Sequence, residues 1–296
     1  MAETTGIAWT GATWNPWHGC IKVSDGCKFC YMYADKARFG QDPRIVQRSK
    51  TTFRAPLKWN DPRLVFTCSW SDWFIEEADA WRAEAWEIVR DTPHTYQILT
   101  KRPERIAECL PADWGSGYRN VWLGVSVENQ EWADRRIQAL LETPAFVRFL
   151  SVEPLLGPVD LRPWIGYAHY DGNVPGACVD IDGMSLHRSG PYRCRECGWG
   201  FPNDPDRPGA VEGIGWLIIG GESGPGARKC EVEWVRDLVE QCRDAGVACF
   251  VKQLGANVWD QGAHLFLDDR KGGGPEEWPE DLRVRQFPEA RTEAQP

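Results

Sequence analysis

The sequence predicts an α/β fold in which about six or seven parallel strands form a partial (β/α) barrel. Three observations support this prediction: six short apolar runs recur along the 296 residues, amphipathic stretches separate most of them, and polar residues follow each run. Strands that alternate with helices are typical of parallel pairing with right-handed crossovers. The chain length suits one large domain or two smaller ones.

The apolar runs have the length and the aliphatic and aromatic content of buried strands. They span residues 63–68, 95–99, 120–127, 145–152, 215–221 and 247–253. An opening strand is expected within residues 7–20. Amphipathic helices are expected in residues 77–91, 129–142 and 231–246. The last of these ends in Gly246, a residue suited to a helix C-cap.

Polar residues gather at the predicted carboxyl end of every strand. They are Ser69, Ser71, Asp72, Thr100, Lys101, Arg102, Ser126, Glu128, Asn129, Ser151, Glu153, Glu222, Ser223, Lys252 and Gln253. Helix caps favour Ser, Asp and Asn, but they do not explain Glu, Lys and Gln at the same positions. Because a β/α barrel assembles its active site at the carboxyl ends of the strands, the pattern favours a barrel. An open doubly wound sheet is the alternative.

One segment interrupts the series of strands. Residues 162–212 are rich in Gly, Pro and Asp, and we interpret them as an insertion between barrel parts at 1–161 and 213–258. Within it, Cys194 and Cys197 form a CxxC pair, and the nearest residues that could complete a Cys3His zinc site are Cys178 and His187. Free thiols are the alternative. Residues 259–296 are interpreted as a C-terminal tail, which we expect to be flexible or loosely packed from about residue 268.

Composition restricts the class of protein. The net charge of −9 argues against coating nucleic acid by bulk electrostatics. No apolar run approaches the roughly 18–20 residues that span a bilayer, so we expect no membrane partner. The first residues do not resemble a signal peptide, and we expect a cytoplasmic protein. In that reducing compartment, clustered cysteines favour metal binding over disulfides. Isolated cysteines, at positions 68, 109, 230, 242 and 249, are expected in the core.

The stretch "GCIKVSDGCKFCYMY" places Cys20, Cys27 and Cys30 within eleven positions, with no fourth cysteine nearby. Iron–sulfur clusters are commonly held by four cysteines. Three protein ligands would leave one iron open to an exogenous molecule, as catalytic zinc sites leave one position open. We therefore predict a [4Fe–4S] cluster, shielded by Phe29 and Tyr31. His18 is expected to cap the loop or to hydrogen-bond a sulfur rather than to be a ligand.

Clustered cysteines that end in CxxC and an aromatic residue, at the start of a β/α barrel, resemble the radical S-adenosylmethionine (SAM) superfamily. Its usual spacing is CxxxCxxC, whereas six residues separate Cys20 from Cys27 here. The segments "TWNPWHGCIKVSDGCKFCY", "FLSVEPLLGPVDL" and "GGESGPGAR" resemble the phage and prophage family defined by its three-cysteine motif. The barrel of that family is similar to that of spore photoproduct lyase. The resemblance covers about residues 5–160 and 213–255.

The resemblance implies that the three cysteines ligate the cluster, that SAM chelates its open iron, and that reduction releases a 5′-deoxyadenosyl radical. The strand ends would then hold SAM and substrate. Contacts to the methionine part are expected from Ser69, Ser71 and Asp72, and ribose or substrate contacts from Ser126, Glu128 and Glu153. Thr100, Gly221 and Glu222 are further candidates, and Lys101 and Lys252 could bind a carboxylate or phosphate.

We expect the substrate to be a nucleobase, a nucleotide or nucleic acid in a phage context, in the host cytoplasm, with an external electron donor. The basic run from Lys36 to Lys58 is a candidate for phosphate contact. Two alternatives remain. "RCRECGWG" favours a zinc- or cluster-stabilised nucleic-acid-binding protein without catalysis. A zinc hydrolase or deaminase would need more histidine ligands than the five available, which show no HxE or HExxH spacing.

Overall fold

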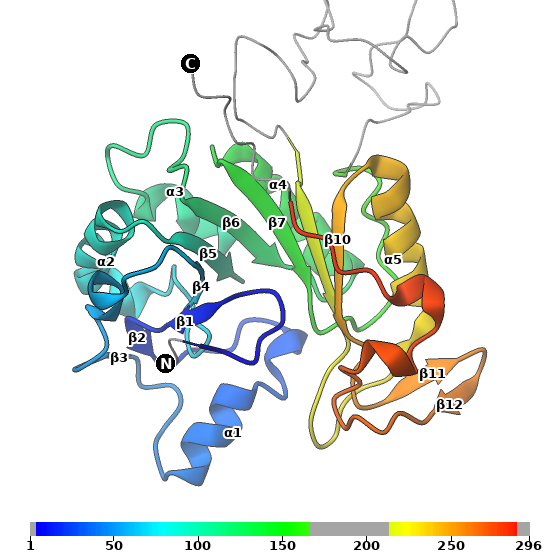
Figure 1. Cartoon of the computed structure of the whole chain (residues 1–296). Coiled ribbons are helices and arrows are strands. Elements are labelled where there is room, and N and C mark those ends of the chain that lie inside the picture. Colours follow the sequence, from blue (N-terminus) through cyan, green and yellow to red (C-terminus); the bar gives the residue numbers. More distant parts are fainter. Residues whose placement is uncertain (1–3, 166–212, 289–296) are drawn as a thin grey trace, which may run out of the picture.

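A computed structural model describes residues 4–165 and 213–288. In this part of the chain, the main sheet has seven strands: β1 (Ala12–Trp14), β4 (Leu64–Thr67), β5 (Thr95–Thr100), β6 (Val121–Ser126), β7 (Val147–Val152), β8 (Trp216–Gly220) and β10 (Ala248–Gln253). Neighbouring strands are parallel and follow chain order. The sheet curls into half a barrel (Figure 1). This order agrees with the predicted partial barrel and not with a doubly wound sheet, where it reverses.

The three predicted helices are α2 (Asp79–Asp91), α4 (Gln130–Glu142) and α5 (Val232–Ala245). Their apolar stripes and one set of alternating strand residues form the larger core, on the outer face of the sheet. Gly246 ends α5 with a φ of 66°, in the left-handed region that favours glycine. A short helix, α3 (Ile106–Cys109), follows β5.

The other set of alternating strand residues points to the inner face, where aromatic rings fill the amino-terminal half. Trp9, Trp122, Phe149, Trp216 and Phe250 belong to this second core. The ring of Trp216 lies 5.6 Å from that of Trp122 and 5.8 Å from that of Phe149. A Cβ at position 124 would lie 2.6 Å from the Phe149 ring, so Gly124 makes room for it. This half of the barrel is packed rather than hollow.

Towards the carboxyl ends, the same alternation places small and polar residues on the inner face. They are Lys101, Ser126, Ser151, Gly220 and Lys252. The polar half of the inner face, which we define by these five residues, lies next to the loop that carries the three cysteines.

Sequence periodicity did not predict the elements around that loop. β2 (Trp17–His18) pairs antiparallel with β3 (Gln47–Arg48), and α1 (Tyr31–Arg38) begins directly after Cys30. In Figure 1, α1 extends away from the sheet. Each element is short or lacks a clear apolar period, so its formation depends on tertiary contacts.

The segment after Val258 packs more firmly than the sequence suggests. β11 (Val258–Asp260) pairs with β12 (Ala263–Leu265) and with β9 (Cys230–Glu231). Trp278 and Leu282 are buried in the larger core. The amide of Val251 donates to Val284 O at 2.8 Å, and that of Gln286 donates to Cys249 O at 2.8 Å. Isolated aromatic and edge-pairing residues therefore anchor residues 259–288, most of which are exposed or half-buried.

None of the helices in residues 4–165 and 213–288 combines the length and apolarity that a membrane crossing requires.

Candidate functional site

The cysteine loop, which we define as residues 20–30, starts where the strands end. β1 ends at Trp14, and β2 leads the chain to Gly19. Gly19 has a φ of 98°, and a Cβ there would lie 2.2 Å from Ile45 O, so only glycine fits. Its amide donates to Trp70 O, just after β4, at 2.9 Å. The loop therefore lies at the carboxyl edge of the sheet, as the sequence predicts.

The three loop cysteines are half-buried and free of disulfides. Burial, and to a smaller extent Asp72, raises the pKa of Cys20 to about 12. Burial also raises the pKa of Cys30, and the charge of Cys27 would raise the pKa of both neighbours. Cys20 and Cys30 are thus protonated at neutral pH without a metal, and a bound metal would displace their protons.

In the described ranges, no group of three or more His, Cys, Asp or Glu side chains is arranged to hold a metal ion. Iron–sulfur clusters are ligated by separate cysteines. The guanidinium of Arg102 donates Nη1–H to Cys20 Sγ at 3.8 Å. Hydrogen bonds to ligand sulfurs of this kind tune such clusters.

Arg102 ties the loop to the strand ends. Its Nη2 donates to Ile21 O at 2.8 Å, and its Nη1 forms an ion pair with Asp72 Oδ2 at 3.1 Å. Asp72 is 4% exposed and also accepts from Thr100 Oγ1 at 2.7 Å and from the amides of Phe74 and Lys101. Its oxygens are therefore already engaged. Asp72 and Thr100, which are expected to contact SAM, hold Arg102 in place in this structure.

The cysteine loop rests on the side chain of Glu128, which we call the seat of the loop. Glu128 is fully buried, and its Oε1 accepts from Ser24 Oγ at 2.6 Å and from Lys101 Nζ at 2.5 Å. Its Oε2 pairs with Arg136 at 2.8 Å. Burial raises the pKa of Glu128, but Lys101 and Arg136 outweigh it and hold that pKa below its usual range.

Gly26, in the cysteine loop, packs closely against the side chain of Glu128. A Cβ at this position would lie 2.4 Å from Glu128 Cγ, so the loop reaches its seat only with glycine there. Glu128 thus anchors the cysteine loop.

A second clamp comes from the loop after β8. Glu222 accepts from the Arg228 amide and Nε at 2.9 Å and from its Nη2 at 2.6 Å. Arg228 Nη1 in turn donates to Asp25 O at 2.9 Å, and its guanidinium lies 5.5 Å from the centre of the Phe29 ring. Glu222, expected to contact SAM, therefore fixes Arg228 over the cysteine loop.

The serines after β4 also make internal bonds. Ser71 Oγ donates to Gly19 O at 2.6 Å, and Ser69 Oγ accepts from Asn15 Nδ2 at 2.9 Å. The phenol of Tyr31 donates to Ser69 O. Gly221 serves packing, because a Cβ there would lie 2.0 Å from Leu254 O.

Glu153 and Lys252 are partly accessible among the expected contacts. They form an ion pair between the ends of β7 and β10, and their side chains are 19% and 24% exposed. Lys101, at 21%, is comparable. The structure brings these three groups and Ser126 to one edge of the sheet, around the polar half of the inner face.

Other predicted residues have different surroundings. His18 Nδ1 is buried and lacks a hydrogen-bond partner in the described ranges. Burial, and then Lys36, lowers the pKa of His18. Much of the basic run is paired internally: Arg44 with Asp42, and both Arg48 and Arg54 with Glu84. The zinc candidates Cys178, His187, Cys194 and Cys197 lie outside the described residues.

Sequence reasoning missed the partners that hold the loop: Ser24, Gly26, Arg136 and Arg228. Arg136 is 2% exposed. Its spacing from Ala133, Ile137 and Leu140 places it on the buried face of α4, and that signal could have identified it.

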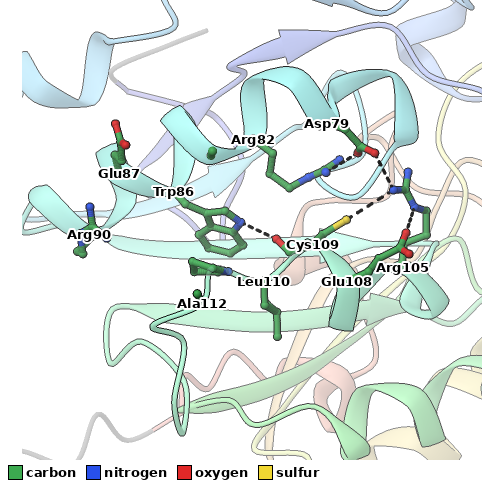
Figure 2. A pocket seen from close by; sticks show the side chains of 12 residues that line it. Asp79, Arg82, Trp86, Glu87, Arg90, Arg105, Glu108, Cys109, Leu110 and Ala112 are labelled. Carbon is green, nitrogen blue, oxygen red and sulfur yellow. Dashed lines mark hydrogen bonds and ion pairs between the residues drawn. The ribbon is translucent and has the colours of Figure 1, made fainter.

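A hollow of about 600 Å³ lies elsewhere, between α2 and α3 (Figure 2). Its charged groups are largely paired with one another: Arg105 bonds Asp79 and Glu108, and Arg82 bonds Asp79. None of the predicted site residues lines it, so we do not assign the candidate site there.

The chain thus has a half-barrel sheet, and a loop with three cysteines lies at the carboxyl edge of that sheet. A family model described as a protein of unknown function (DUF5131) matches residues 4–286, so the chain belongs to that family. No curated protein and no solved structure matched the chain.

Proposed function

We propose that this protein is a radical SAM enzyme whose [4Fe–4S] cluster is held by Cys20, Cys27 and Cys30. One observation carries the proposal: three half-buried thiols share one loop at the carboxyl edge of a parallel half barrel. Catalytic groups of β/α barrels lie at this edge. The resemblance of the three-cysteine segment to radical SAM proteins supports the same assignment.

In this proposal, the residues of the chain bind and orient. When bound, the cluster supplies the electron that cleaves SAM to methionine and a 5′-deoxyadenosyl radical. Arg102, Glu128 and Arg228 hold the loop that presents the cysteines, through Cys20 and Ile21, Ser24 and Asp25 respectively.

SAM would occupy the polar half of the inner face. Ser126 and Ser151 have small polar side chains there and Gly220 has none, whereas the aromatic half below is filled by rings. Lys101 and Lys252 are partly exposed at its rim and carry the charge that a carboxylate or phosphate requires.

We further propose a nucleobase, nucleotide or nucleic-acid substrate, a one-electron donor, and action in the cytoplasm of a phage-infected cell. The resemblance to the phage family supports the substrate class. The eight cysteines of the described part are free, which suits a reducing compartment.

The test is anaerobic reconstitution with iron and sulfide. The wild-type protein should be brown, hold about four irons, and release 5′-deoxyadenosine from SAM under reduction. Cys27→Ala should lose colour and cleavage. Cys109→Ala, which removes a half-buried cysteine outside the loop, should retain both. A Cys27→Ala protein that still cleaves SAM would refute the cluster assignment.

Substrate identity is tested by incubating the reduced protein with SAM and a panel of nucleosides and oligonucleotides. A SAM-dependent mass change in one of them supports the substrate class. Cleavage of SAM without any such change across the panel would count against it.

A further inference from the structure

Lys36, on α1, is a buried cation without a carboxylate partner. It is 1% exposed, and its Nζ makes no hydrogen bond and no ion pair with any residue that the structure describes. By contrast, the buried arginines Arg82, Arg102 and Arg136 each pair with a carboxylate. Buried charges in proteins are usually paired, because desolvation of an unpaired charge is costly. Lys36 is therefore suited to pairing with an anion from outside the chain.

The ammonium of Lys36 keeps a narrow contact with solvent. Met32 and Lys36 are the buried residues of α1 and lie one turn apart, so the Lys36 stem runs along the covered face of this helix. Nζ, however, does not belong to the fully covered polar atoms that lack a partner. The side chain thus buries its methylene groups and presents its charged end at an opening, as snorkelling lysines do. A small anion can reach the ammonium there.

His18 faces the same space from β2. The preceding residue, Trp17, is fully buried and donates its indole Nε1–H to Asp72 O at 3.0 Å, so the alternation along the strand directs His18 to the opposite side. Burial lowers the pKa of His18, and the charge of Lys36 lowers it further, because the two groups lie near each other. His18 Nδ1 is covered and has no hydrogen-bond partner in residues 4–165 or 213–288. Two polar groups without partners therefore lie between β2 and α1.

The segment after α1 encloses this space without neutralising Lys36. The amides of Phe39 and Gln41 donate to Lys36 O at 3.1 and 2.9 Å, so the chain wraps around the end of the helix. Asp42 is close enough for its charge to raise the pKa of Lys36, against the stronger effect of burial. Its oxygens, however, accept from the Arg44 amide and Nε at 3.0 Å and from Arg44 Nη2 at 2.9 Å. The nearby carboxylate is thus already engaged.

The local charge selects an anion. Residues 20–58 contain nine Lys or Arg and three Asp, a net charge of +6, in a chain of net charge −9. The ammonium offers three N–H donors, and a neutral imidazole carries one N–H that can lie on Nδ1. A phosphate group matches this set, because its oxygens accept several hydrogen bonds and it carries about two negative charges. A carboxylate would satisfy fewer of the donors.

We infer that Lys36 and His18 bind a phosphate group in the space between α1 and β2. Lys36 Nζ pairs with the phosphate oxygens, and His18 Nδ1–H donates to one of them. This inference goes beyond the proposed function, because neither the cluster nor SAM uses Lys36. Free phosphate, a nucleotide and the backbone of a single-stranded nucleic acid all present this group, so the experiment includes each of them.

The first test is thermal unfolding with inorganic phosphate at constant ionic strength. Phosphate at a few times its dissociation constant should raise the wild-type midpoint by about 2–4 °C, because it binds the folded state. Lys36→Met keeps the length of the stem and removes the charge, so its midpoint should not respond. Without phosphate, this variant should be at least as stable as wild type, because a buried unpaired charge is removed. Lys58→Met, at an exposed position of the same basic run, should respond like wild type.

Nuclear magnetic resonance of protein with isotope-labelled lysine locates the bound phosphate. The Lys36 Cε signal is assigned as the one absent from Lys36→Met, and it should shift on titration with phosphate while the Lys58 signal stays unchanged. A Lys36 signal that does not move, or equal stabilisation of wild type and Lys36→Met, would overturn the inference. Equal stabilisation by acetate would also overturn it, because that result indicates a general salt effect.

The three carriers are separated by titrating a deoxynucleoside monophosphate and a single-stranded oligonucleotide against the same Lys36 signal. Binding about tenfold tighter than inorganic phosphate, or more, assigns the site to that carrier. No gain over inorganic phosphate assigns it to free phosphate. Either result supports the inference, whereas a shift caused by a nucleoside without phosphate would contradict it. These measurements need no SAM, reductant or bound iron, so their outcome is independent of the proposed function.

Discussion

The two halves of the inner barrel face share the same strands but are built by different interactions. The amino-terminal half is closed by aromatic rings around Trp216. The carboxyl-terminal half is bordered by three buried or half-buried ion pairs, from Glu128, Asp72 and Glu222 to Arg136, Arg102 and Arg228. The first half therefore supplies non-directional packing, and the second fixes a loop in one position.

The two kinds of interaction make different contributions to a site built on a half barrel. Aromatic packing gains free energy roughly in proportion to the area buried and tolerates some repacking. Paired charges cost desolvation energy and contribute most to specificity of position. We therefore expect substitutions in the aromatic half to change stability, and substitutions at the polar edge to change the position of the cysteine loop.

The largest effect is expected in the aromatic half. Trp216→Ala should lower the free energy of unfolding by about 3–5 kcal/mol, because it removes a fully buried ring and leaves a cavity. Urea unfolding measures the loss, with Phe266→Ala, at an 86% exposed position, as the control. The folded fraction should still bind iron. If Trp216→Ala lost iron binding without losing stability, the proposed difference in role between the aromatic half and the polar edge would be wrong.

An intermediate effect is expected at the seat of the loop. Gly26→Ala should cost about 1–3 kcal/mol, because its Cβ would meet the Glu128 side chain at 2.4 Å. Iron content should fall while the circular dichroism spectrum is retained. Gly157→Ala, where a Cβ meets nothing within 4 Å, is the matched control. Unchanged iron content in Gly26→Ala would show that the loop does not depend on this seat.

The smallest effect on stability is expected from lowering the pH. The pKa of Glu128 is lowered in the folded protein, so its contribution to stability is complete above the unfolded value of about 4.3. It decreases as pH falls through that value towards the folded one. The urea midpoint of wild type should therefore fall more steeply in this range than that of Glu128→Gln. Parallel pH profiles would contradict the anchoring role of Glu128.

Much of the fold was predictable because its signals are local. The strands of the main sheet from β4 onward, and α2, α4 and α5, follow from runs and periods within single segments. Their parallel arrangement agrees with the alternation of strand and helix. The short elements α1, β2 and β3 carry no such signal.

The sequence predicted which types of residue lie near the candidate site, but not which residues pair with one another. The sequence indicates that Asp72, Glu128 and Glu222 lie near the strand ends. It does not show that Arg102, Arg136 and Arg228 engage them. Arg102 reaches Asp72 from the end of another strand and Arg136 reaches Glu128 from α4, so these pairings depend on tertiary structure, whereas Arg228 lies in the same loop as Glu222. As a result, the sequence did not show that side chains expected to contact a ligand also hold the cysteine loop.

The pairing of residues 284–286 with β10 has a consequence for solubility. β10 is the outer strand on its side of the sheet, and the amides of Val251 and Gln286 complete hydrogen bonds between it and this segment. An uncovered strand edge is a template for joining another chain. The final described stretch therefore acts as a protective cover against intermolecular sheet growth, and a chain shortened before Val284 would be prone to aggregation.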